Sequence, residues 1–164
     1  MTREIEEAYK QWQFTRGNTV ALIKQLGDEG LKTELPRKGL DTFCKHFEEM
    51  IAVQTTCIQA IETGVMSFDC CKESDDDYEG LSTVKELLQD MEKADKQMME
   101  VISSKDENSQ VDWWGTPTTV VGQIIWQISH ETFHFGQLIA FAHVLDIKPP
   151  EKVISSWLLS GFEN

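Results

Sequence analysis

The sequence predicts an all-α fold: a four-helix bundle followed by a short C-terminal helix. Four segments, each of roughly 20 to 28 residues, carry apolar side chains at helical intervals. Glycine, proline and polar clusters separate these segments, and nowhere does an alternating apolar pattern stand between hairpin-turn signals. A chain of 164 residues has the size of one domain, so we assign residues 1–164 to a single unit whose core needs no disulfides.

The first helix is predicted over residues 3–26. Its apolar stripe consists of Ile5, Tyr9, Trp12, Val20, Ile23 and Leu26. Gly27 ends this helix, because glycine is a poor helix former and a common helix terminator. The second helix is predicted over residues 40–62, with Gly64 as its terminator.

An acidic segment, residues 70–80, follows the second helix. It lacks the D-x-D-x-D-G spacing of a calcium-binding loop, so we expect a solvated connection. The third helix, residues 83–103, opens with the capping box Thr-Val-Lys-Glu. The fourth helix, residues 118–145, is the most apolar, and a proline pair separates it from a short last helix over residues 151–159.

The chain is strongly acidic. Its formal net charge is −13, from 15 basic and 28 acidic residues. Such a surface repels phosphate backbones and anionic lipid, so we expect no nucleic-acid partner and no membrane association. No apolar run reaches the length of about 18 residues that a membrane span needs, and residues 1–7 are too charged for a signal peptide.

The four cysteines, Cys44, Cys57, Cys70 and Cys71, form neither a C-x-x-C pair nor a disulfide framework. With no export signal, the simplest expectation is a cytoplasmic protein with reduced thiols. A redox or metal role for Cys70 and Cys71 stays open beside the simpler interpretation that two loop thiols are incidental.

The most informative motif is His130-Glu131-Thr132-Phe133-His134. On a helix, its two imidazoles lie one turn apart along the axis and about 40° apart around it, so they can share one metal ion. Their face of the helix is mostly apolar and should point into the bundle, where two buried histidines need partners. A lone buried histidine is most often bonded to a carbonyl group, but a pair at this spacing favours a shared metal.

His46 is the candidate for a third ligand. It lies in the middle of the second predicted helix, among apolar residues at helical spacing, whereas His143 lies on the opposite side of the fourth helix from the pair. Three imidazoles, from His46, His130 and His134, suit a borderline divalent cation, chiefly zinc or nickel. They leave one or more positions open for water or substrate.

Motifs that match a known family in their order run nearly from end to end of the chain. They are Thr15-Arg16, residues 25–31, Pro36, His46, residues 121–124, residues 130–138, residues 147–150 and Trp157. This ordered set resembles the DinB-like (YfiT-type) superfamily of metal-binding four-helix bundles. The resemblance implies a divalent metal held by His46, His130 and His134, with Gln137 beside the site and Gly136 permitting close helix packing.

Many members of that superfamily read H-H-R-G-Q where residues 133–137 here read Phe-His-Phe-Gly-Gln. The ligand histidine is kept, but Phe135 stands in place of the arginine, so any anion-binding role of that arginine is lost. Characterised members include S-transferases that use bacillithiol or mycothiol, and a maleylpyruvate isomerase. The resemblance therefore implies a metal-dependent transferase that acts on a small-molecule substrate with a low-molecular-weight thiol.

Such an enzyme needs a base and a substrate pocket. Glu131 and Glu49 are the candidate bases, although a surface or helix-pairing role fits both at least as well. Glu131 lies about 100° around the helix from His130, a position that can face a neighbouring helix. Gln137 and Trp126 are the candidate pocket-lining residues. The methionines and tryptophans of the third and fourth helices fit subunit contacts as well as a core, and we expect a homodimer.

Two other functions stay open. The H-E-x-x-H string also matches zinc peptidases, but a metzincin needs glycine and histidine where this chain has Gln137 and Ala140, and a gluzincin would depend on Glu151 as its acidic ligand. The third class is non-catalytic: a structural metal site, a metal-dependent sensor or a scaffold. Replacing His46 separates the bundle site from the peptidase, because only the bundle site would lose its metal.

Overall fold

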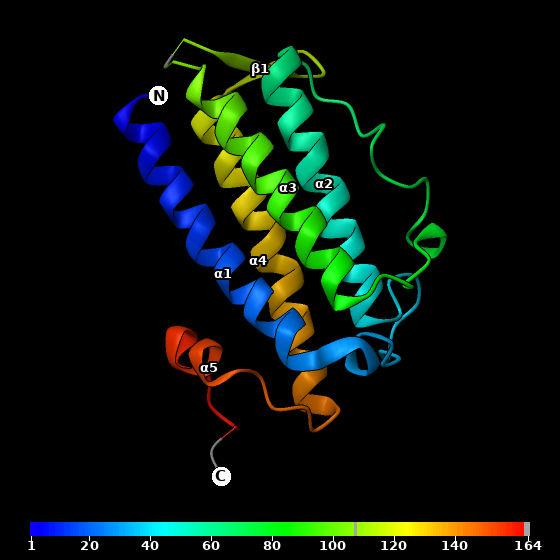
Figure 1. Ribbon diagram of the computed structural model, residues 1–164. Helices are drawn as coiled ribbons and strands as arrows, with labels where there is room; N and C mark the ends of the chain where they lie inside the picture. The colour runs from blue at the N-terminus through cyan, green and yellow to red at the C-terminus, as the bar shows by residue number, and fades with distance from the viewer. Residues whose placement is uncertain (107, 163–164) are drawn as a thin grey trace.

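The structure, a computed structural model, describes residues 1–106 and 108–162. Its long helices are α1 (Arg3–Leu31), α2 (Phe43–Thr63), α3 (Val84–Ser103) and α4 (Val120–Val144), which form an elongated bundle (Figure 1). α1 packs mainly against α4, α2 packs against both α3 and α4, and the short α5 (Glu151–Trp157) packs against α1. The predicted four-helix bundle with a short C-terminal helix is confirmed. Residues 107 and 163–164 of the predicted domain lie outside the described residues.

A threonine is the N-cap of each of the four long helices, and its hydroxyl accepts a hydrogen bond from a backbone N–H of the first turn. These N-caps are Thr2, Thr42, Thr83 and Thr119. α1 is longer than predicted. Gly27, with φ 65° and ψ 175°, interrupts the helix at its predicted end, and the chain then makes one more turn to Leu31.

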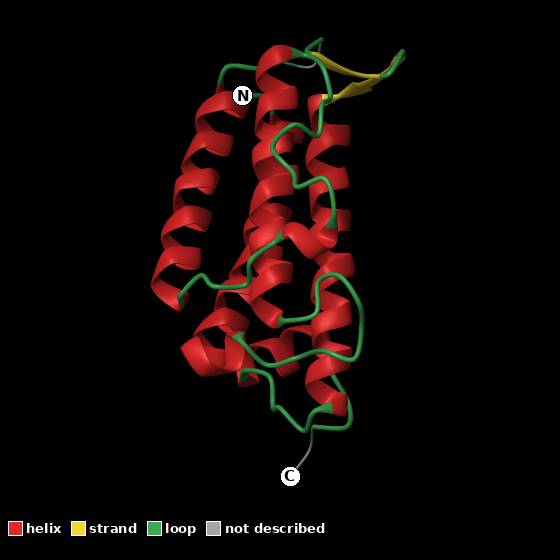
Figure 2. Cartoon of the chain, turned by 90° about the vertical axis from the view of Figure 1, so that its right-hand side faces the viewer, coloured by secondary structure: helices red, strands yellow, loops and turns green. Residues whose placement is uncertain are grey.

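A short β-hairpin, absent from the predicted elements, connects α3 to α4 (Figure 2). β1 (Gln110–Trp113) pairs antiparallel with β2 (Thr116–Thr119). Trp114 and Gly115, at its turn, have φ of 49° and 89°, as the type I′ turn of a tight hairpin requires. The hairpin escaped prediction because four-residue strands show little alternation, and Trp-Gly is not a pair that marks such turns.

The connection between α2 and α3, residues 64–83, runs along the outside of the bundle (Figure 1). Its acidic part is the predicted loop, with one 3₁₀ turn, η1 (Asp75–Asp77). Glu48 on α2 holds the end of this loop, because its carboxylate accepts hydrogen bonds from the backbone N–H groups of Gly80 and Ser82.

Two apolar clusters fill the bundle, one toward each end. The first includes Ile5, Trp12, Ile61, Met98 and Ile124, and the second includes Leu22, Phe43, Phe47, Leu87 and Leu138. Between them, buried polar side chains form a layer that consists of Arg16, Thr19, Gln54 and Glu131. The candidate functional side chains lie next to this polar layer. In the part of the chain that the structure describes, no helix has both the length and the apolar character to cross a membrane.

Candidate metal centre

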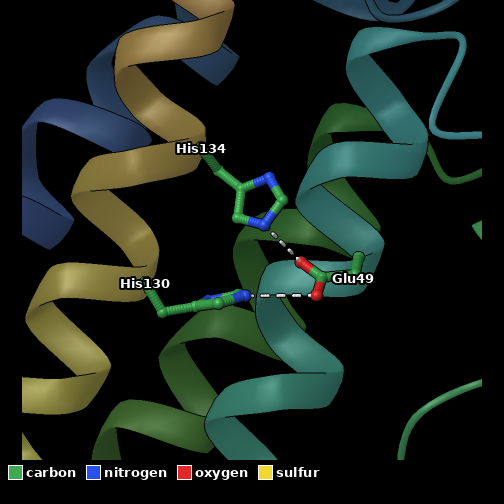
Figure 3. A group of neighbouring side chains, drawn as sticks. All are labelled: Glu49, His130 and His134. Carbon is green, nitrogen blue, oxygen red and sulfur yellow. Dashed lines mark hydrogen bonds and ion pairs between the residues drawn. The ribbon is translucent and has the colours of Figure 1, made fainter.

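His130 and His134 lie one helical turn apart on the side of α4 that faces α2, and Glu49 of α2 reaches toward both (Figure 3). Glu49 Oε1 lies 3.2 Å from His130 Nε2, and Glu49 Oε2 lies 3.3 Å from His134 Nε2. One ligand atom from each residue lies within 4.8 Å of the others. The predicted histidine pair therefore shares one partner, the carboxylate of Glu49.

The separations of these atoms fit a divalent cation. Around a tetrahedral zinc ion with ligand bonds of about 2.0–2.1 Å, neighbouring ligand atoms lie about 3.3–3.4 Å apart. Each histidine Nε2 lies at about this distance from one oxygen of Glu49, 3.2 Å from Oε1 for His130 and 3.3 Å from Oε2 for His134. The carboxylate would have to turn to bring a single oxygen to that distance from both rings. Two imidazoles and one carboxylate are also a donor set of catalytic zinc sites, in which three protein ligands leave a position open.

His46 lies at the other edge of the His134 ring. It is fully buried, and its Nδ1 lies 3.0 Å from Nδ1 of His134. One ring donates the proton between these two atoms and the other ring accepts it, so the contact couples the tautomers of both. The structure thus brings the three predicted histidines together, but His46 contacts His134 on the edge opposite Glu49. A ligand role for His46 stays a prediction.

Burial keeps the rings of His46 and His134 neutral. It lowers the pKa of His46 to about 4, helped by the charge of Arg37, and it lowers the pKa of His134 to about 4 against the opposing charge of Glu49. Metals bind the neutral imidazole, because its ring nitrogen keeps a free lone pair. At neutral pH these rings can therefore bind a cation without first losing a proton.

Glu131, the second residue of the H-E-x-x-H string, faces α1. Its fully buried carboxylate accepts a 2.6 Å hydrogen bond from Thr19 and lies 3.1 Å from Nη2 of Arg16. Burial raises the pKa of this carboxyl, and Arg16 and Thr19 oppose the rise. With both oxygens occupied by α1, Glu131 fits a structural role better than that of a base. This placement argues against the peptidase alternative, which needs this glutamate beside the metal.

The two candidate pocket residues lie on either side of the histidine pair along α4. The Trp126 ring stacks on the ring of His130, with centroids 5.7 Å apart and planes 23° apart. Gln137 is half-buried, and its side-chain oxygen has no hydrogen-bond partner within the described residues. Trp126 thus contacts the site directly, while the role of Gln137 stays a prediction.

Sequence reasoning named Glu49 as a base rather than as a ligand. The available signal was its spacing, three residues after His46, which places both side chains on one face of α2. Cys70 and Cys71 have partners elsewhere: Cys70 Sγ donates to Gln59, and Cys71 Sγ lies 3.6 Å from Oγ1 of Thr56. Their role stays open.

The fold and the site together define a helical-bundle protein with a candidate metal centre between α2 and α4. The sequence model of the DinB family matches residues 1–152, and the chain belongs to the DinB family. A crystal structure of a DinB-like protein from Bacillus cereus is similar in fold, with a TM-score of 0.68 and 17% sequence identity over 88% of this chain and 95% of that chain. A comparison with curated proteins found no match. The predicted family is confirmed.

Proposed function

We propose that Glu49, His130 and His134 hold a divalent metal ion, zinc or nickel, and that the protein is a metal-dependent enzyme acting with a low-molecular-weight thiol. The observation that carries the metal proposal is that one ligand atom from each of these three residues lies within 4.8 Å of the other two. The thiol is supported by the family resemblance alone, so it needs its own test.

The chain supports the ligands on three sides. His46 can accept a hydrogen bond from Nδ1–H of His134, which leaves Nε2 of His134 free to bind a metal. The buried pair of Arg16 and Glu131 holds α4 against α1 one residue after His130. The ring of Trp126 covers one face of His130. These contacts restrict the orientation of both imidazoles before any cation arrives.

A divalent ion bound here would supply Lewis acidity and favour the thiolate form of a coordinated thiol. The candidate site is only partly buried, because the side chains of Glu49, His130 and His134 keep 14%, 17% and 10% of their surface exposed. Phe135 is buried in the core, so the position that holds arginine in many relatives offers no cation to an anionic substrate. We therefore propose a neutral electrophile rather than a carboxylate as the second substrate.

Elemental analysis of protein purified without added metal tests the first half of the proposal, and a thiol-transfer assay tests the second. We expect about one equivalent of zinc or nickel, lost in Glu49→Gln. Bacillithiol, glutathione and cysteine, each with a chromogenic electrophile, should then show turnover in the metal-loaded protein only. A metal-loaded protein that turns over none of these thiols would contradict the transferase and leave the non-catalytic alternative.

We also propose that the protein is a homodimer that associates through the outer face of α4. This helix exposes no Asp, Glu, Lys or Arg, although such residues make up 26% of the chain. Ile125, Phe133 and Val144 are exposed along it. An uncharged face lets two acidic copies meet without bringing their carboxylates together. Light scattering that gives the mass of one chain would contradict this proposal.

A further inference from the structure

Four aromatic rings gather beside the candidate metal centre, where the β-hairpin meets α4. This aromatic cluster consists of Phe68, Trp113, Trp114 and Trp126. Trp113 packs edge-on against Trp126 at 5.1 Å and against Trp114 at 5.8 Å, and Phe68 lies 6.0 Å from Trp114 and 6.1 Å from Trp126. Because Trp126 also stacks on His130, the cluster is continuous with the metal-binding side chains.

A cavity of about 460 Å³ opens at this cluster. Its lining residues are Trp113, Trp114, Thr116, Thr118, Gly122, Gln123 and Trp126. This volume lies in the range of small-molecule sites. None of these described lining residues is charged, so the cavity has three indole rings and a few hydroxyl and amide groups to offer. Such a lining suits an uncharged aromatic group better than an anion. A cation held over the indole faces is the alternative that the test below must separate.

The cavity is built on fixed side chains. Gln123 is fully buried, and its Oε1 accepts a 2.8 Å hydrogen bond from Nε1 of Trp113, which sets the orientation of that ring. The hairpin turn is held in the same way, because the Asp112 carboxylate accepts hydrogen bonds from the backbone N–H of Gly115. A ligand that enters would therefore meet walls already in place, which lowers the entropic cost of binding.

Trp114 occupies a position that its own folding preferences do not explain. It is the first central residue of a type I′ turn, where a φ of 49° favours Asn, Asp or Gly and strains a bulky residue. The residue is 70% exposed, so burial of the ring offsets little of that strain. Strained backbone is concentrated at ligand-binding and catalytic positions. The strained turn places the indole ring of Trp114 at the rim of the cavity.

We propose that this cavity binds an uncharged planar aromatic group by stacking against Trp114 and Trp126. Trp126 contacts both the cavity and His130, so the bound group would lie one indole ring away from the candidate metal centre. The inference goes beyond the proposed function, because binding in this cavity requires no metal ion.

Isothermal titration calorimetry on the full chain, with and without EDTA, tests the proposal with three probes: 1-naphthol, its saturated counterpart decahydro-1-naphthol, and tetraethylammonium. We expect saturable binding of 1-naphthol in both conditions, at least about tenfold weaker binding of the saturated probe, and none of the cation. Equal binding of the saturated probe, tighter binding of the cation, or naphthol binding abolished by EDTA would each overturn the proposal. Loss of thiol turnover alone would leave it standing.

Trp114→Asn separates stacking from folding, because asparagine suits the type I′ turn and removes the ring. We expect the melting temperature of this variant to be equal or higher, and its affinity for 1-naphthol to fall about tenfold or more. Trp157→Ala is the matched control, since it removes a partly exposed tryptophan on α5 that packs on Phe14. Unchanged affinity in Trp114→Asn, or an equal loss in Trp157→Ala, would refute the assignment.

Discussion

Replacing Glu49 and His46 in turn tests which side of the His134 ring faces the metal ion. Glu49 lies at Nε2 of that ring and His46 at Nδ1, so a single ion bound through one nitrogen has only one of them as a fellow ligand. We expect Glu49→Gln to remove a ligand, and His46→Leu to remove only the hydrogen-bond partner of His134.

The two variants should differ in size of effect. Binding free energies of about 10–16 kcal/mol for zinc held by four ligands correspond to roughly 2.5–4 kcal/mol per ligand, or a loss of about 70- to 900-fold in affinity. Loss of a partner that orients a ligating histidine typically weakens affinity by about 10–100-fold. Glu49→Gln should therefore weaken binding more than His46→Leu does.

Competition against a chromophoric chelator at pH 7.5 measures both constants. Glu48→Gln is the matched control, because Glu48 neighbours Glu49 on α2 but its carboxylate bonds to the 80–82 loop. We expect this control to retain wild-type affinity. If His46→Leu loses as much affinity as Glu49→Gln or more, the ion lies on the Nδ1 side of His134 and the assignment of Glu49 is wrong.

Three further predictions concern stability. The folded pKa of both His46 and His134 is about 4, below the ordinary 6.5, so the unfolded chain takes up protons first as the pH falls. The metal-free protein should therefore keep full stability above pH 6.5 and lose on the order of 3 kcal/mol per histidine toward pH 4. Denaturant titrations that show no such loss would contradict this prediction. Glu131→Gln removes one of the two carboxylates beside the buried Arg16, while Asp95 stays 3.4 Å from its Nε, so the free energy of unfolding should fall by about 1.5–3 kcal/mol; an unchanged unfolding midpoint would refute the role of this pair. Gly27→Ala should cost about 1–3 kcal/mol in the same assay from backbone strain alone, since nothing lies within 4 Å of the added Cβ, and a neutral result would show that α1 straightens.

The helices and the histidine pair could be predicted because each depends on local patterns. Apolar spacing and threonine caps mark the helix positions, and two histidines four residues apart share a helix face whatever surrounds them. The break at Gly27 was predictable for the same reason. The additional turn to Leu31 was not, because the chain resumes a helical conformation after the glycine only through its tertiary packing.

The partners of the site could not be predicted, because they depend on how one helix is rotated against another. Glu48 and Glu49 differ by about 100° around α2, and one binds a loop while the other faces the histidines. Spacing from His46 favours Glu49 over Glu48 as the residue on the histidine face, but it does not show that the histidine pair of α4 lies opposite. The pairing of Arg16 with Glu131 could not be predicted either, because it depends on which residues of α1 and α4 face each other across their interface; Arg16 also lies 3.4 Å from Asp95 of α3.

The buried pair of Arg16 and Glu131 restricts how the helices can slide. Displacing α4 by one turn along α1 would shift it about 5.4 Å and leave the buried carboxylate of Glu131 without its arginine, while Arg16 would keep only Asp95 of α3. Aliphatic contacts alone would tolerate the offset far better. Glu131 directly follows His130 in the chain. The ion pair that selects a single alignment of α1 and α4 therefore also sets the position along the bundle axis at which the imidazoles contact the Glu49 carboxylate of α2.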